Sequence, residues 1–154
     1  MEENLSNGMI NSYAVSSQNL KMAEGKSFEE VLQRFREITF HETFDMIVAI
    51  ANGGIIPAAI INQRLNTEIQ LLKINLRDPD QKPKYDSPKL IAPIDFDYKD
   101  KIILLVEDRV KTGATVQFAV DLLQGARQVK TFAVNGKADY SLYDEACFRF
   151  PWII

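Results

Sequence analysis

The sequence predicts an α/β fold, a three-layer arrangement in which helices flank both faces of a parallel sheet. Apolar runs of strand length alternate with segments of helical periodicity along the 154 residues. Strands that are apolar on both sides indicate a sheet that is covered on both faces. The composition, 46% hydrophobic and 25% charged, is typical of a soluble globular protein, and the length suits a single domain over residues 1–154.

The elements follow from local patterns. Residues 1–26 are polar and read as an N-terminal arm. A capping box, Ser27 with Glu30, starts an amphipathic helix over 28–40. The remaining predicted elements are strand 46–51, helix 55–65, strand 69–74, strand 102–106, a helix from Val116 that closes near Gly125, strand 129–135 and a last strand over 147–154. Residues 76–99 carry many prolines and charges, and a loop of that length is usually functional or disordered.

Composition excludes several classes of function. The net charge of -3 argues against non-specific nucleic-acid binding, and we expect no nucleic-acid partner. Cys147, the only cysteine, allows no intrachain disulfide and is expected on a buried strand. His41 is the only histidine, so a Cys/His metal site is not expected. No secretory signal or membrane-spanning run is seen, so we expect a cytoplasmic protein that does not enter the membrane.

The segment after the third strand has the chemistry of a phosphate site. It reads Val106-Glu107-Asp108-Arg109-Val110-Lys111-Thr112-Gly113-Ala114-Thr115. Ligands of parallel sheets bind beyond the carboxyl ends of the strands. At a loop that turns into a helix, backbone amides and the helix dipole attract anions, so Lys111–Thr115 can cradle a phosphate. The alternative is an ordinary turn with Thr112 or Thr115 as N-cap.

Two acidic residues precede this cradle. The carboxylates of Glu107 and Asp108 can accept hydrogen bonds from the vicinal hydroxyls of a ribose, or hold Mg²⁺. In the alternative interpretation, Asp108 only caps the turn. Gly53-Gly54, after the first strand, lets backbone amides approach a second anion such as a diphosphate. The alternative there is a tight turn that needs positive φ.

Together these residues resemble the type I phosphoribosyltransferases, with purine-type members most similar. The signature of that family is two acids, a short variable stretch and Thr-Gly-x-Thr, which is similar to 107–115 here. Upstream, the run from Asp45 to Ala58 looks like the family's first strand and diphosphate loop. The likeness covers roughly residues 28–136.

The resemblance implies an enzyme of nucleotide salvage. It would transfer the 5-phosphoribosyl group from phosphoribosyl diphosphate (PRPP) to a nitrogen of a nucleobase-like, purine-like acceptor, with Mg²⁺ as cofactor and release of diphosphate. The implied chain architecture adds a mobile lid loop within 76–99, a hood at 147–154, and a homodimer or higher homo-oligomer.

The resemblance also implies roles for individual residues. The residues with implied catalytic roles are Glu107, Asp108 and Lys111, the first two also as metal ligands. The 5-phosphate would lie on Lys111, Thr112, Gly113, Ala114 and Thr115. The diphosphate would contact Ala51, Asn52, Gly53, Gly54 and Lys73. Trp152 would stack on the base, or else be a buried ring of an edge strand.

Three positions depart from the family pattern. Lys111 stands where 6-oxopurine enzymes usually carry an aspartate that faces the purine, so the local charge is reversed, and Lys111 could contact an anionic group instead. Asn52 stands where Arg or Lys is frequent, and Arg109 adds a cation inside the signature.

Two other hypotheses follow from the same residues. A PRPP- or nucleotide-binding regulatory protein of this fold with little or no turnover would keep the same motifs, because fold does not determine function. A phosphoacceptor receiver domain also has acids at a strand end. That fold needs more strands after Asp108 than the remaining chain supplies.

Overall fold

The computed structural model describes residues 25–75 and 87–154. The predicted N-terminal arm up to residue 24 and positions 76–86 of the predicted lid lie outside the described residues. The chain divides into two compact units. The larger comprises Arg34–Asp144, and the smaller joins the segment up to Gln33 with Glu145–Ile154.

The larger unit is built on a six-stranded sheet, which confirms the predicted α/β class. Its strands are β1 (Met46–Ala51), β2 (Glu68–Asn75), β3 (Lys89–Leu90), β4 (Ile102–Arg109), β5 (Gln128–Asn135) and β6 (Tyr140–Tyr143). Their order across the sheet is β3-β2-β1-β4-β5-β6. Every neighbouring pair is parallel except β2 and β3. The antiparallel edge strand β3 was not predicted.

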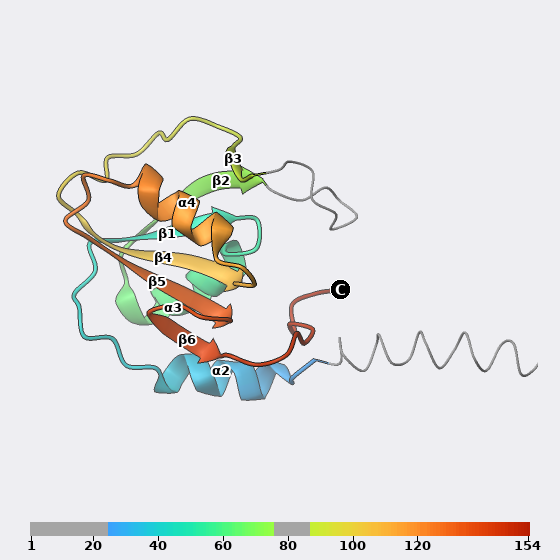
Figure 1. Ribbon diagram of the computed structural model, residues 1–154. Helices are drawn as coiled ribbons and strands as arrows, with labels where there is room; N and C mark the ends of the chain where they lie inside the picture. The colour runs from blue at the N-terminus through green and yellow to red at the C-terminus, as the bar shows by residue number, and fades with distance from the viewer. Residues whose placement is uncertain (1–24, 76–86) are drawn as a thin grey trace, which may run out of the picture. The chain divides into compact units, whose positions relative to one another are not determined.

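Helices cover both faces of this sheet. Helix α4 (Ala114–Leu122) lies in front of the sheet and α3 (Ile55–Leu65) behind it (Figure 1). On the α4 face, Ala119 packs with alternate apolar residues of the central strands. Helix α3 buries Pro57, Ala58 and Ile61 and contacts β1, β2 and β4. The predicted helix from Ser27 is α2 (Phe28–Glu37), whose Glu30 amide donates to the Ser27 hydroxyl at 3.1 Å.

The prediction of a strand over 147–154 is wrong. These residues form no strand, and the last strand is β6. Their alternation comes from aromatic packing, because Phe148 and Phe150 are buried with ring centroids 5.3 Å apart. Pro151 then removes a backbone donor that a sheet would need. The same alternation leaves Cys147 exposed, so its predicted burial is also wrong.

Residues 87–99, the described part of the predicted loop, contain only the short strand β3 as regular structure, and they pack against the sheet. After β3 the chain runs along the sheet, and Ile94, Phe96 and Tyr98 pack against the core on the α4 face. Their spacing of two residues suits an extended segment with one buried side. The charges between them masked this pattern in the sequence. Among the residues described, no helix is long and apolar enough to cross a membrane.

Candidate active site

The carboxyl ends of β1 and β4 form one site. The two strands are parallel neighbours, with Ala49 opposite Val106. The loop after β1 therefore meets the acidic pair at the end of β4. A Cβ placed on Gly53 would stand 2.6–2.8 Å from the three carboxyl atoms of Asp108, well inside normal contact. The missing side chain of Gly53 is thus what admits the Asp108 carboxylate.

Gly54, in the same loop, packs against backbone atoms of the strands. A Cβ at Gly54 would strike the carbonyl oxygen of Val106, and would lie 2.9 Å from that of Ile50. The Gly54 amide donates to Ile50 O at 2.8 Å, so the turn into α3 is packed directly on the two strands. The peptide bond between Ala51 and Asn52 is cis. The alternative of a turn that needs positive φ does not hold, because Gly54 has φ at -80° and Gly53 is not among the glycines with positive φ. Close packing requires a glycine at both positions, against backbone at Gly54 and against the Asp108 carboxylate at Gly53.

The acidic pair lies on the strand itself, since β4 continues to Arg109 instead of ending at Val106. The Asp108 amide donates to Glu107 Oε1 at 2.9 Å, and the Arg109 amide donates to Asp108 Oδ1 at 2.6 Å. Burial raises the pKa of Glu107 well above its usual value, and the charge of the adjacent Asp108 raises it further. Donors or cations from a ligand would relieve this repulsion.

The loop after β4 presents open amides at the start of α4. The N-cap is Gly113, with φ at 83°, and no side chain caps the helix. Thr112 Oγ1 accepts only a long bond of 3.3 Å from the Ala114 amide. Within the described part of the chain, the amides of Thr115 and Val116 donate to no acceptor. The capping interpretation does not fit Thr115, and these groups can receive an anion.

A contact that the sequence analysis did not single out holds this loop in place. The Val110 amide donates to the carbonyl of Asn135, at the end of β5, at 2.9 Å. Gly136 follows with φ at 136°, and a Cβ there would lie 2.8 Å from that of Val110. A glycine directly after a predicted strand was the available signal. The close approach ties the end of β5 to the loop after β4.

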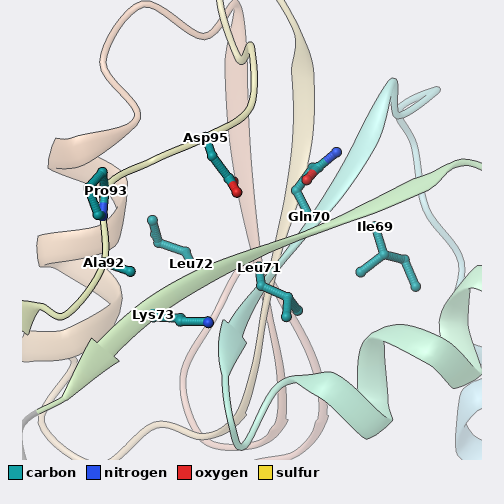
Figure 2. A pocket seen from close by; sticks show the side chains of 8 residues that line it. All are labelled: Ile69, Gln70, Leu71, Leu72, Lys73, Ala92, Pro93 and Asp95. Carbon is teal, nitrogen blue, oxygen red and sulfur yellow. The ribbon is translucent and has the colours of Figure 1, made fainter.

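Two further predicted site residues are Lys73 and Trp152. Lys73 is opposite Ala51 in the register of β1 and β2. It lines a pocket of about 270 Å³ between β2 and the segment Ala92–Asp95 (Figure 2), which no other predicted site residue lines. Trp152 belongs to the smaller unit, where its ring stacks on Phe150 at 5.1 Å and meets Phe28 edge-on at 6.3 Å.

Known proteins share this sequence pattern and this fold. A curated relative, the xanthine-guanine phosphoribosyltransferase of Idiomarina loihiensis, is 25% identical over 136 residues, which are 82% of this chain and 84% of the relative. The orotate phosphoribosyltransferase of Pyrobaculum islandicum is also 25% identical, over 130 residues, which are 84% of this chain and 63% of the relative.

Solved structures show the same fold at lower identity. The purine phosphoribosyltransferase of Pyrococcus horikoshii superposes with a TM-score of 0.70 at 22% identity, over 84% of this chain and 92% of that one. A Neisseria gonorrhoeae protein with bound ppGpp superposes with a TM-score of 0.65 at 17% identity, over 84% of this chain and 88% of that one. The family model of the phosphoribosyl transferase domain matches residues 19–150. With most of its length matched and both motifs joined in one site, the chain belongs to the phosphoribosyl transferase family of pentosyl-transferring enzymes.

Proposed function

We propose that this protein transfers the 5-phosphoribosyl group of PRPP to a ring nitrogen of a nucleobase-like, purine-like acceptor and releases diphosphate. The observation that carries the proposal is the meeting of Gly53 with the Asp108 carboxylate, beside the open amides of α4. These groups match the parts of PRPP in order: a diphosphate, a diol and a 5-phosphate. Family membership supplies the reaction class.

Each group has a defined role in the proposal. The segment Lys111–Thr115 holds the 5-phosphate through its amides and hydroxyls and the Lys111 ammonium group. The backbone of Ala51–Gly54 contacts the diphosphate. Glu107 and Asp108 accept hydrogen bonds from the ribose hydroxyls. Lys73 remains a proposed diphosphate contact, and Trp152 a proposed base contact. The acceptor nitrogen bonds to the anomeric carbon as the carbon–oxygen bond to diphosphate breaks. The rate acceleration comes from positioning of the two reactants and from neutralisation of the charge that develops on the diphosphate.

The acidic pair also fits a magnesium ion. Mg²⁺ is usually held by one or two carboxylates together with phosphate oxygens of the substrate, a donor set that Glu107 and Asp108 match. No group of three or more metal-binding side chains occurs among the described residues. When bound, Mg²⁺ would neutralise charge on the departing diphosphate. The raised pKa of Glu107 shows that a negative charge is disfavoured there in the protein alone.

The decisive measurement is diphosphate release from PRPP across purines and pyrimidines, with and without Mg²⁺. We expect release with at least one acceptor, and a drop of roughly tenfold or more in PRPP affinity for Asp108→Asn. Asp121→Asn is the matched control, because the exposed Asp121 carboxylate on α4 accepts a hydrogen bond only from the Gln117 side chain among the described residues. PRPP binding without release from any acceptor would point instead to a regulatory nucleotide-binding protein, and absence of PRPP binding would refute the proposal.

A further inference from the structure

The proposed phosphate segment, Lys111–Thr115, is held in place from the side of β5. Val110 directly precedes this segment, and its amide donates to the carbonyl oxygen of Asn135 at 2.9 Å. Gly136, which follows Asn135, is buried against Val110. A Cβ on Gly136 would lie 2.8 Å from the Val110 Cβ and 2.9 Å from the Val110 nitrogen. The position of Gly136 therefore limits where Val110, and the segment after it, can lie.

Both backbone polar groups of Gly136 are bonded to β6. The Gly136 amide donates to the carbonyl oxygen of Tyr143 at 2.9 Å. The Gly136 carbonyl oxygen accepts a hydrogen bond from the Ser141 hydroxyl at 2.5 Å. Gly136 has φ at 136°, and a glycine has little conformational stiffness of its own. The two bonds to β6 therefore supply a restraint that the residue itself lacks.

Strand β6 is a firm attachment for these bonds. It pairs in parallel with β5, with Asn135 opposite Tyr143. Leu142 and Tyr143 are buried, and the guanidinium group of Arg34 lies 4.7 Å from the centre of the Tyr143 ring. The Ser141 hydroxyl is thus carried by a strand that is fixed on its own account. A hydrogen bond from such a strand restrains the group that accepts it.

We propose that Ser141 is a positioning residue for the 5-phosphate. Its hydroxyl fixes Gly136, Gly136 fixes Val110, and Val110 sets the phosphate segment in the position that receives the phosphate. The inference rests on the proposed function and adds to it a residue that touches no substrate. Because Ser141 acts on the side of β5, its loss should loosen the phosphate segment and leave the turn after β1 unchanged.

Hydrogen exchange, followed by NMR, measures this restraint without any ligand. In Ser141→Ala the Val110 amide should exchange roughly fivefold to tenfold faster than in the wild type, because its bond to Asn135 opens more often. The Gly54 amide, which donates to Ile50 on the β1 side at 2.8 Å, is the internal reference and should change far less. Ser141→Thr keeps the hydroxyl and should restore slow exchange. Equal exchange of Val110 in the wild type and Ser141→Ala overturns the inference.

Two ligands show whether the restraint serves the phosphate. Ribose 5-phosphate and inorganic diphosphate with Mg²⁺ bind different parts of the proposed PRPP site. In calorimetric titrations, Ser141→Ala should bind ribose 5-phosphate roughly threefold to tenfold more weakly and diphosphate almost as the wild type does.

Thr131→Val is the matched control. The Thr131 hydroxyl donates to the Asp139 carboxylate at 3.1 Å and accepts from the Asp139 amide at 2.9 Å, so it holds the other end of the same connection between β5 and β6. Its loss should lower the melting temperature without a selective loss of ribose 5-phosphate affinity.

The outcomes separate this inference from the proposed function. A loss of ribose 5-phosphate affinity that is equally large in Thr131→Val, or that equals the loss of diphosphate affinity in Ser141→Ala, overturns the positioning role. So does full ribose 5-phosphate affinity in Ser141→Ala. If the wild type binds neither ligand, the proposed function fails, and the phosphate role of Ser141 fails with it. Binding that depends on Ser141, without diphosphate release from PRPP, removes only the transfer reaction.

Discussion

The carboxylate of Asp108 lies in the space that a side chain at position 53 would occupy, 2.6–2.8 Å from where a Cβ on Gly53 would stand. The two residues belong to different motifs: Gly53 lies in the turn after β1, and Asp108 lies near the end of the neighbouring strand β4. Their contact is what turns two separate sequence patterns into one site, and it makes the site sensitive to a single methyl group.

Gly53→Ala should weaken PRPP binding more than it weakens the fold. The added Cβ meets the end of the Asp108 side chain, which can rotate away at little cost in stability but then no longer aims at the ligand. Gly54→Ala is the contrasting variant, because its Cβ meets backbone atoms of β1 and β4 and should lower the melting temperature. Calorimetric titration with Mg²⁺ and PRPP measures the effect of each variant on binding, and thermal unfolding measures its effect on stability. The same pattern in both variants would contradict this assignment.

Glu107→Gln should raise stability and weaken PRPP binding. The glutamine keeps the size of the side chain but removes a carboxylate whose ionised form is disfavoured by burial and by Asp108. We expect a higher melting temperature without ligand and a smaller rise on adding Mg²⁺ with PRPP. A lower melting temperature in the ligand-free protein would show that the acidic pair stabilises the fold instead.

Gly113→Val should cost stability through backbone strain and also block the phosphate cradle. Gly113 has φ at 83°, and a β-branched residue in that region costs about 1–2 kcal/mol. No protein atom lies within 4 Å of its added Cβ, so loss of PRPP affinity would come from crowding the ligand. Gly125→Val is the matched control, since Gly125 has φ at 108° beyond the far end of α4. It should lose comparable stability and retain PRPP affinity. Unchanged affinity in Gly113→Val would place the 5-phosphate elsewhere.

Tyr140→Phe should make the stability of the fold less dependent on pH in the alkaline range. Burial raises the pKa of Tyr140 above its usual 10.0, and its hydrogen bond to Glu42 adds to the shift. Because the folded protein holds the phenol proton more tightly than the unfolded chain, this stabilisation is complete below about pH 10 and is lost as pH rises through the raised pKa. The free energy of unfolding of the wild type should exceed that of the variant by about 1–2 kcal/mol at pH 8. The difference should be smaller near pH 11.

Urea unfolding at a series of pH values measures that difference. The Phe40 ring, 4.8 Å from that of Tyr140, can pack equally well against phenylalanine, so packing should change little. Tyr98→Phe, whose ring lies beside Phe96, is the control that removes the same atom elsewhere. A gap between wild type and Tyr140→Phe that stays constant with pH would exclude the proton linkage.

The sequence by itself determined the main elements and the chemistry at the strand ends. The predicted limits of β1 and α3 match the structure, because an uninterrupted apolar run and a Gly-Gly break are local signals. The same reasoning failed at 147–154, where alternating aromatic residues pack on one another without pairing as a strand. Alternation reports which side chains are buried and does not report a hydrogen-bonded neighbour.

Only the tertiary structure decided which strand ends are neighbours. No local periodicity predicts the lateral order β3-β2-β1-β4-β5-β6, because the sequence pattern of each strand is compatible with more than one neighbour. That order brings Gly53 to Asp108, and Gly136 to Val110. The residue types at the site were therefore readable from the chain. Their convergence depended on long-range pairing between segments that are far apart in sequence.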